Sequence, residues 1–395
     1  MKRSLIVSLC SVGFLAKFSY ALPRNPVLPL FALFLGAGPE AIGLAVGIST
    51  VTGIFFKLPA GALSDIIGRR KTLLIGLGFF AVIPFAYFFI DNYHTLVVVR
   101  FLHGFATAIY GPVAMAVVAD VAGNQKGEML SWFSTVGIVG TLLGAPVGGF
   151  LLSFVGGGEQ TSTTFMVIFA IVAVTGVMAF VLGAIILPKE EQVVSPPEGS
   201  KFAGFLSGIC EVGSDKRVLV TSSMESARHL ALGVLEAFLP IYAVAVVGLS
   251  PFHAGLLYAV QIIAAVVAKP VMGRYSDRYG RKYFIAVGLI CCSLPIICIP
   301  WLTSFSYLLV ACLIFGLGEA FVTSSAAALV ADFCKAKQYG TAMGVFGTIF
   351  DVGHAAGPIL GGILIASLGY AAAFGLVGGA LLLVVPVFLY VLREE

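Results

Sequence analysis

Charged residues are what this sequence has least of. Only 11% of its 395 residues are Asp, Glu, Lys or Arg, whereas a soluble globular protein carries about 25%. Hydrophobic residues make up 59% of the chain and the mean hydropathy is +1.05. Such a chain cannot cover a water-facing surface of its size, so most of its surroundings must be lipid. The net charge of +4 is small and does not indicate a nucleic-acid partner.

The sequence also lacks the common signatures of catalysis and cofactor binding. It contains no HExxH, GxSxG, P-loop or dinucleotide fingerprint. Its seven cysteines show no CxxC or Cys/His ligand spacing, and most lie in apolar runs, where cysteine behaves as a small hydrophobe. We therefore predict that the chain is not an enzyme, holds no metal or cofactor, and is driven by an ion or substrate gradient instead of ATP.

Apolar runs long enough to cross a bilayer, about 20 residues each, occur twelve times. The first run follows Lys2 and Arg3, as a signal peptide would, but its apolar character resumes beyond Lys17 and favours a spanning helix. The sequence thus predicts an all-α membrane protein with twelve transmembrane helices. The predicted spans are residues 5–35, 41–60, 72–90, 96–119, 129–155, 164–187, 218–247, 253–272, 283–303, 307–331, 341–368 and 371–392.

One short charged loop occurs twice in the chain. Residues 61–71 read GALSDIIGRRK, and residues 273–282 read GRYSDRYGRK, an offset of 212 (273 − 61). Further glycines and aspartates repeat at offsets of 212 or 213, which indicates a duplicated domain. We predict two pseudo-symmetric six-helix bundles, residues 1–187 and 218–395, joined by a cytoplasmic linker at 188–217.

The basic residues predict the orientation. Seventeen of the 23 Lys and Arg residues lie in the termini and in the loops on the same side as the termini, six lie inside spans, and the opposite loops hold none. Because cytoplasmic loops carry the excess of Lys and Arg, both termini are predicted to be cytoplasmic. We expect a monomeric, multi-pass protein of a cell membrane, most simply a prokaryotic plasma membrane.

These features together resemble the major facilitator superfamily. The repeated loop matches that family's G-x-L-x-D-x-x-G-R-R/K motif after the second and eighth spans, with Tyr275 at the apolar third position of the second copy. The fourth span carries Arg100 and Gly104, which resemble the family's arginine motif. Residues 140–149 and 357–362 resemble its glycine-proline antiporter motif, although Pro146 sits one place late. The resemblance covers essentially the whole chain.

The resemblance implies a membrane transporter whose repeated loops form a cytoplasmic gate. In the family, a charge network at these loops latches the two halves and breaks when the transporter switches. The gate residues that it implies here are Gly61, Asp65, Gly68, Arg69, Asp120, Gly273, Asp277, Gly280, Arg281 and Asp332. It also implicates Arg100 in proton coupling.

Basic residues in the first and seventh spans form the first candidate substrate site. Lys17 and Arg24 are seven residues apart and so share a helix face. Aligning Pro29 with Pro240 places Lys17 opposite Arg228, and a pseudo-symmetric basic pair would suit an anionic substrate. The alternative is internal pairing, since Glu225 precedes Arg228 by three residues. Both interpretations stay open at this point.

Buried carboxylates form the second candidate site, because a carboxylate in apolar surroundings can carry a proton. Glu236 has no basic neighbour within its own helix, and His354 follows Asp351 by three residues as a possible partner. The candidates for proton coupling are Glu225, Glu236, Glu319, Asp351 and Arg100. Weaker candidates for substrate contact are Glu236 itself, Tyr242 and Gln261.

Three functions fit these residues. The first is proton-coupled export of a small amphipathic or anionic organic compound by alternating access. The second is uptake or exchange of a small organic anion, which Lys17, Arg24 and Arg228 would support. The third is translocation of a lipid or lysolipid, which requires a lateral opening.

Overall fold

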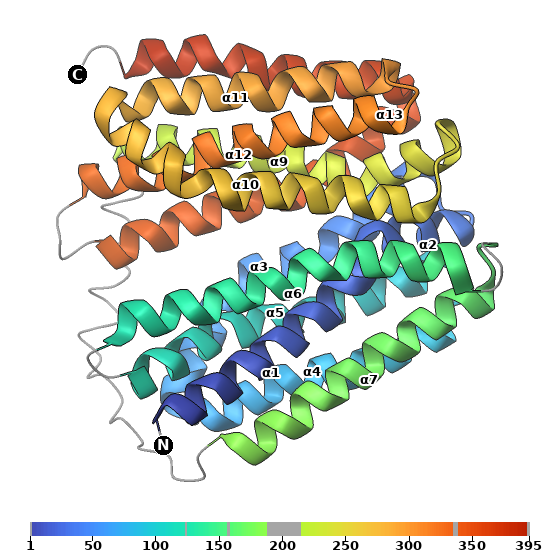
Figure 1. The fold of residues 1–395 in the computed structure, drawn as a ribbon, viewed down its shortest axis with the longest axis vertical. Coiled ribbons are helices and arrows are strands. Elements are labelled where there is room, and N and C mark those ends of the chain that lie inside the picture. Colours follow the sequence, from blue (N-terminus) through green and yellow to red (C-terminus); the bar gives the residue numbers. More distant parts are fainter. Residues whose placement is uncertain (1, 123–124, 156–158, 188–214, 335–338, 393–395) are drawn as a thin grey trace. The chain divides into compact units, whose positions relative to one another are not determined.

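The protein is helical throughout the part of the chain that its computed structural model describes, residues 2–122, 125–155, 159–187, 215–334 and 339–392 (Figure 1). Eleven helical segments in these ranges are long and apolar enough to span a membrane. The last of them, α13 (Tyr339–Val391), breaks at Gly369, where φ is 78° and ψ is 173°. Counted as two crossings, it brings the total to the twelve spans predicted, which confirms the all-α membrane fold.

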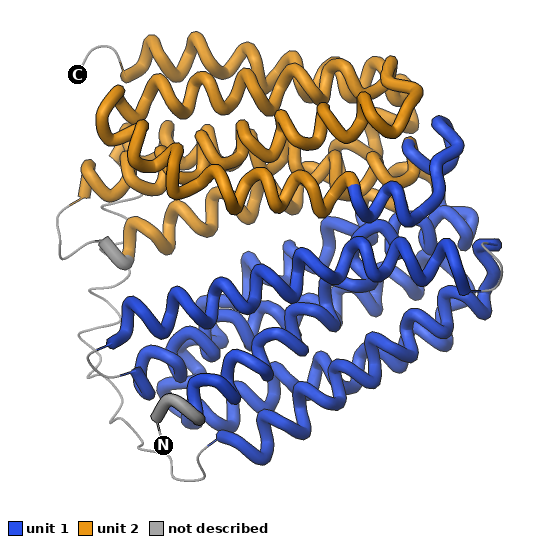
Figure 2. Tube along the Cα trace, in the orientation of Figure 1, with its two compact units in different colours: residues 1–37, 44–196, 243–256 blue, residues 38–43, 197–242, 257–395 orange. Residues whose placement is uncertain are grey.

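Two compact units divide the chain, residues 1–37, 44–196 and 243–256 in unit 1 and residues 38–43, 197–242 and 257–395 in unit 2 (Figure 2). The predicted linker at 188–217 lies outside the described residues as far as residue 214, and the predicted bundle boundaries stay a prediction. The helices of the first half are α1 (Lys2–Leu22), η1 (Pro23–Val27), α2 (Leu28–Phe34), α3 (Pro39–Ile66), α4 (Arg69–Ala86), η2 (Tyr87–Phe89), α5 (Tyr93–Ala122), α6 (Lys126–Phe154) and α7 (Ser162–Ile186). Those of the second half are α9 (Lys216–Ile241), η5 (Tyr242–Val246), α10 (Pro251–Tyr279), α11 (Arg281–Cys298), η6 (Ile299–Trp301), α12 (Phe305–Phe333) and α13.

In unit 1, α1 packs between α6 and α7, and α4 packs on α5 and α7 (Figure 1). The first span is irregular after Leu22. Asn25 has extended backbone angles (φ −148°, ψ 124°) because the residue before a proline is driven out of the helical region. The proline-rich η1 therefore separates α1 from α2 and places Arg24 at a break in the span.

In unit 2, α9 is the most enclosed of the described spans. Of its most apolar window, 72% is buried, against 33–50% for the other spans. It packs along α13 and also contacts α12 and α11. Ionisable side chains on α9 are consequently surrounded by protein, and they must find partners there.

The repeated loop has a repeated backbone. Gly68 and Gly280 precede α4 and α11, and both have φ of 98°. This left-handed region is open to glycine but disfavours a side chain with a Cβ. The repetition seen in the sequence is thus a repetition of local structure, with each glycine turning the chain into the next helix.

An aspartate starts α9. The Asp215 side chain accepts a hydrogen bond from the Arg217 backbone N–H at 2.9 Å and pairs with the Arg217 guanidinium at 2.9 Å. The Arg217 side chain holds the pKa of Asp215 below its ordinary value. Because a lowered folded pKa stabilises the charged form, this small contribution to folding is present above the unfolded pKa and is lost as the pH falls through the folded one.

The glycine-proline motifs are packing surfaces within their units. A Cβ built on Gly148 of α6 would lie 2.5 Å from the Leu22 carbonyl oxygen. On α13, a Cβ at Gly357 would collide with the Leu230 carbonyl group of α9. These glycines let two helix backbones approach closely, as small residues do in membrane proteins.

We predict that Gly357→Ala destabilises the protein by about 1–3 kcal/mol, the usual cost of overpacking. The added methyl group must push α13 away from α9. Gly375→Ala on the same helix is the matched control, because its Cβ would meet no atom within 4 Å. Thermal unfolding of the purified variants in detergent checks this, and equal midpoints for the two variants would contradict it.

Candidate functional site

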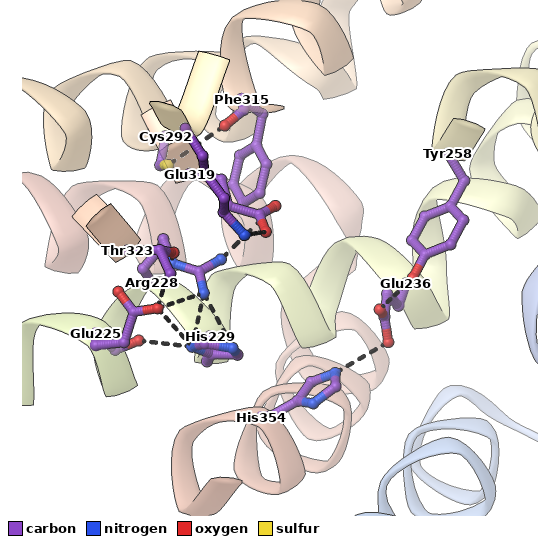
Figure 3. A network of polar contacts seen from close by, with 11 residues as sticks. Glu225, Arg228, His229, Glu236, Tyr258, Cys292, Phe315, Glu319, Thr323 and His354 are labelled. Carbon is purple, nitrogen blue, oxygen red and sulfur yellow. Dashed lines mark hydrogen bonds and ion pairs between the residues drawn. The ribbon is translucent and has the colours of Figure 1, made fainter. Parts of the chain in front are cut away.

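Arg228 and Glu225 of α9 form a buried ion pair in unit 2 (Figure 3). The Arg228 Nη2 group donates to Glu225 Oε1 at 2.8 Å, and both side chains are 1% exposed. Their spacing of three residues on α9 places them on the same helix face. Arg228 Nη2 also lies 2.8 Å from His229 Nδ1. The pairing that the sequence suggested as an alternative is therefore formed.

The pair is connected to two further helices. Thr323 of α12 donates to Glu225 Oε1 at 3.0 Å. Glu319, one turn earlier on α12, has Oε2 3.8 Å from Arg228 Nη1 and Oε1 3.8 Å from Lys269 Nζ of α10. Three helices thus meet through a chain of alternating positive and negative groups.

Several buried polar atoms in and beside this network lack a hydrogen-bond partner among the described residues. Glu225 Oε2 and Arg228 Nε have no hydrogen-bond partner within the described ranges, and neither have the hydroxyls of Thr221 and Ser222 on the same helix. Buried polar atoms almost always bind something, whether protein, water or ligand. The surroundings of Arg228 can therefore accept water or polar atoms of a bound molecule.

Glu236 forms a second cluster two turns further along α9. The Tyr258 hydroxyl of α10 donates to Glu236 Oε1 at 2.7 Å, and His354 Nε2 of α13 lies 3.0 Å from Oε2 (Figure 3). Glu236 is 5% exposed. One carboxylate therefore joins three helices through a phenol and an imidazole, both of which can exchange protons.

The two histidines bring the clusters together. The His229 and His354 rings have centroids 5.7 Å apart, and His229 stacks on Phe350 with centroids at 4.6 Å. His229 also lies 3.5 Å from Glu225 Oε1. The histidines thus occupy the space between the Glu225 and Glu236 carboxylates, as Figure 3 shows.

The other predicted residues of unit 2 lie at separate places. Asp351 is buried on α13, one turn before His354. Gln261 is buried where the α10 backbone meets Gly316 of α12. The Tyr242 hydroxyl donates to the Pro300 carbonyl at 2.9 Å, so this hydroxyl already has a structural partner.

Unit 1 holds the predicted basic residues of the first span. The Lys17 side chain packs against Gly140 of α6, and no carboxylate of the described residues lies within the 4.0 Å of an ion pair from its ammonium group. The Arg24 guanidinium lies 5.9 Å from the centre of the Tyr20 ring. Roles in substrate binding for Lys17 and Arg24 remain predictions.

Arg100 is fully enclosed in unit 1. It is 1% exposed, and it donates to the Ala45 carbonyl at 3.2 Å and to Ser49 Oγ at 2.6 Å. Its guanidinium also lies 5.6 Å from the centre of the Tyr20 ring. Nearby, the Tyr87 hydroxyl contacts His103 Nδ1 at 3.1 Å. The role of Arg100 in proton coupling stays a prediction.

The two repeated loops carry matching ion pairs, each inside its own unit. Arg69 binds Asp65 at 2.7 Å and Asp120 at 3.3 Å. The second copy, Arg281, binds Asp277 at 3.1 Å and Asp332 at 3.0 Å. Each arginine thus joins two helix ends that the sequence had assigned to one charge network, and the switching role stays a prediction.

The partners of Glu236 were not predicted from the sequence. The sequence paired His354 with Asp351 and did not connect it to Glu236, and it gave Thr323 no role. These partners come from different helices, so no spacing along the chain marks them. Within the described ranges, no group of three or more His, Cys, Asp and Glu side chains is arranged to hold a metal ion.

Comparison with known proteins assigns the family. Residues 9–223 and 221–395 each match the Major Facilitator Superfamily, so both halves carry the signal. The chain is 22% identical over 370 residues to an uncharacterized MFS-type transporter of Methanocaldococcus jannaschii, covering 92% of this chain and 90% of that protein. It is 26% identical over 400 residues to the Escherichia coli multidrug resistance protein MdtG, covering 96% and 92%.

A more distant relative and two solved structures extend the comparison. The human synaptic vesicular amine transporter is 23% identical over 320 residues, which are 78% of this chain and 58% of that protein. The nucleoside transporter NupG superimposes with a TM-score of 0.82 at 14% identity, covering 99% of this chain and all of NupG. A bacterial homologue of the lysosomal transporter Spinster gives a TM-score of 0.80 at 14% identity, covering 99% and 97%.

These matches confirm the resemblance seen in the motifs and the prediction that the chain is a transporter and not an enzyme. Both halves, the helical fold and the multi-pass architecture agree with one assignment. The chain belongs to the Major Facilitator Superfamily of membrane transporters.

Proposed function

We propose that this transporter works by alternating access and couples the export of a small amphipathic organic compound to protons. It would do so in a prokaryotic plasma membrane, with both termini in the cytoplasm. The relative MdtG is named as a multidrug resistance protein, which supports export of organic compounds. The Glu236 cluster is the observation that carries the proposal of proton coupling.

Glu236 has the properties that a proton carrier needs. It is 5% exposed inside a membrane span, where a charged carboxylate is costly unless it has partners. Its contacts with Tyr258 and His354 can form in more than one protonation state, because a phenol and an imidazole exchange protons readily. A proton on Glu236 would remove the charge that attracts a protonated His354.

That change would act on helix packing. Glu236, Tyr258 and His354 come from α9, α10 and α13, so loss of the Glu236 charge weakens contacts among three helices at once. A proton can shift a conformational equilibrium only if it binds two states with different affinity. If a second conformational state separates α9, α10 and α13, Glu236 loses these contacts there. Its proton affinity then differs between the two states.

The charges around Arg228 favour an amphipathic substrate over an anionic one. Arg228 is already paired with Glu225 at 2.8 Å and lies 3.8 Å from Glu319, so an anion would have to displace a carboxylate. The hydroxyls of Thr221 and Ser222 and the Glu225 Oε2 atom have no hydrogen-bond partner among the described residues. They can form hydrogen bonds with a neutral or cationic group instead. A relative that matches 78% of this chain is named as a vesicular amine transporter, and this name also favours a cationic substrate over an anionic one.

Two alternatives each have one supporting observation. For a carrier of small organic anions, the support is Lys17, whose ammonium group has no carboxylate of the described residues at ion-pair distance, beside Arg24 on the same span. For a lipid or lysolipid translocator, the support is an apolar groove of about 710 Å³ between α1 and α6, lined by Ile6, Val7, Cys10, Ser11, Phe14, Leu15, Glu128, Met129, Trp132 and Val136.

A ligand screen separates these substrate classes. A bound ligand raises the thermal midpoint of the state it binds. Purified protein is heated with cationic amphiphiles, neutral amphiphiles, small organic anions and lysolipids. We expect amphiphiles of the first two classes to raise the midpoint, whereas stabilisation by organic anions or lysolipids alone would favour the corresponding alternative.

We predict that Glu236→Gln strongly reduces pH-driven transport of a stabilising ligand in proteoliposomes. Glutamine keeps the size of glutamate and one oxygen that can accept the Tyr258 hydrogen bond, but it cannot carry the proton. The expected loss of accumulation is about 5- to 150-fold, the range of typical coupling free energies. Glu159→Gln, which changes an exposed glutamate outside the spans, is the control and should transport like wild type.

Exchange of labelled for unlabelled ligand, without a pH gradient, tests whether the Glu236→Gln variant still binds and moves its substrate. Retained exchange with lost pH-driven transport is the expected result. Glu319→Gln and Asp351→Asn test two further candidate carboxylates in the same way. If all three variants accumulated substrate as wild type does, the proposed proton coupling through these carboxylates would be wrong.

We predict that Arg228→Gln destabilises the protein by about 3–5 kcal/mol, the cost of leaving a buried charge without its partner. The double variant Glu225→Gln/Arg228→Gln removes both charges and should recover most of that loss. Thermal midpoints in detergent measure both effects. A double variant no more stable than Arg228→Gln alone would show that the pair does not act as a unit.

A further inference from the structure

One exposed face of α10 changes from apolar to basic near the end of the helix. Val267 is 69% exposed and Val271 is 45% exposed. Arg274 and Arg278 follow at intervals of three and four residues, which places all four side chains on one face of the helix. Both arginines are exposed as well. Two guanidinium groups therefore stand directly after an exposed apolar stripe.

This face lies on the side of α10 away from its polar contacts. Tyr258, which binds Glu236, and Lys269, which lies near Glu319, are both about half a helical turn from Val267. Ionisable and polar groups inside a span turn toward the interior of the bundle. The opposite side, with its exposed valines, is therefore the side of α10 that contacts lipid.

The two arginines make no hydrogen bond or ion pair with the described residues. Asp277 lies three residues after Arg274, but it binds Arg281 at 3.1 Å. Arg281 also binds Asp332 at 3.0 Å, so it already has two carboxylate partners. Arg274 and Arg278 are thus available to a ligand from outside the chain.

Two tyrosines lie beside the arginine pair. Tyr275 and Tyr279 are exposed, and their rings stack with centroids 6.1 Å apart. Exposed tyrosines of membrane proteins gather at the level of the lipid headgroups. Their position indicates that Arg274 and Arg278 also lie at headgroup level.

The first copy of the loop provides an internal comparison. At the offset of 212, Arg274 and Arg278 correspond to Ala62 and Ile66 on α3. Ala62 is exposed, and Ile66 is 65% exposed. The same face is thus exposed in both copies but basic only in the second, so the repeated fold does not by itself require the arginine pair.

We propose that this face of α10 binds an anionic phospholipid, with Arg274 and Arg278 on its phosphate group and its acyl chains along Val267 and Val271. Side chains four residues apart on a helix are neighbours, so both guanidinium groups can reach one phosphate. The planar guanidinium also matches phosphate geometry. The chemistry of this site does not depend on the proposed substrate or on proton coupling.

The test is a lipid titration of delipidated protein in a neutral detergent, read by the thermal midpoint. Phosphatidylglycerol should stabilise the wild type at a lower mole fraction than zwitterionic phosphatidylcholine. Arg274→Gln/Arg278→Gln should weaken the apparent affinity for phosphatidylglycerol about 30-fold, which corresponds to about 1 kcal/mol for each guanidinium. Without lipid this variant should unfold at the wild-type midpoint, because both side chains are exposed.

Two further variants separate a site from general electrostatic attraction. Lys126→Gln/Lys216→Gln removes the same charge at two exposed positions and should respond to lipid as wild type does. Ala62→Arg/Ile66→Arg adds a pair to the first copy, and native mass spectrometry should then detect an additional retained phosphatidylglycerol.

Three results would overturn the proposal. The first is an equal response to phosphatidylglycerol from the two glutamine double variants. The second is stabilisation of the wild type by phosphatidylcholine as strong as that by phosphatidylglycerol. The third is a first-copy arginine variant that retains no additional lipid.

Discussion

The cost of charge in a membrane interior determines how this protein is built. A lone ion in lipid is so unfavourable that each ionisable residue inside a span must face a cavity or a partner. Arg228 and Glu225 meet this requirement on one face of α9, the most enclosed of the described spans. Glu236 meets it with groups from two other helices. The positions of α9, α10, α12 and α13 in unit 2 are therefore tied to the chemistry of a few side chains.

The two halves of the chain share a scaffold but not an electrostatic design. Gly68 and Gly280 repeat with the same φ of 98°, and Arg69 and Arg281 repeat the same double ion pair. The buried carboxylates of α9 and the buried arginine of α5 do not repeat. With Pro29 aligned to Pro240, Glu225 and Glu236 correspond to Phe14 and Asn25, and at the offset of 212 Arg100 corresponds to Cys312. The two halves therefore share a helical scaffold, whereas the carboxylates Glu225 and Glu236 are found only in the second half of this aligned pair of spans.

Much of this could be predicted from the sequence because its causes are local. Apolar runs and the loop motif are read directly along the chain, and they predicted the helical fold and its twelve spans. The spacing of Glu225 and Arg228 predicted their contact, since three residues bring two side chains to one helix face. The close helix packing at the glycine motifs could also be predicted locally. Glycines on one helix face allow the backbone of a second helix to approach closely.

The partners of Glu236 could not be predicted in the same way. Tyr258 is 22 residues away and His354 is 118 residues away, on helices whose relative rotation depends on packing along their whole length. The same holds for Arg100, whose contacts with Ser49 and Tyr20 come from α3 and α1. In each case the sequence identified an ionisable residue that is energetically unfavourable inside a membrane span. Only the three-dimensional structure identified the partners that stabilise it.

We propose that Glu236 carries the coupled proton and releases it when substrate binds. The most direct measurement adds a ligand from the thermal screen to purified protein in weakly buffered detergent and records the proton change with a pH indicator. Wild-type protein should release protons on binding, and Glu236→Gln should bind the same ligand with the release abolished. Equal proton release from the two proteins would contradict the claim.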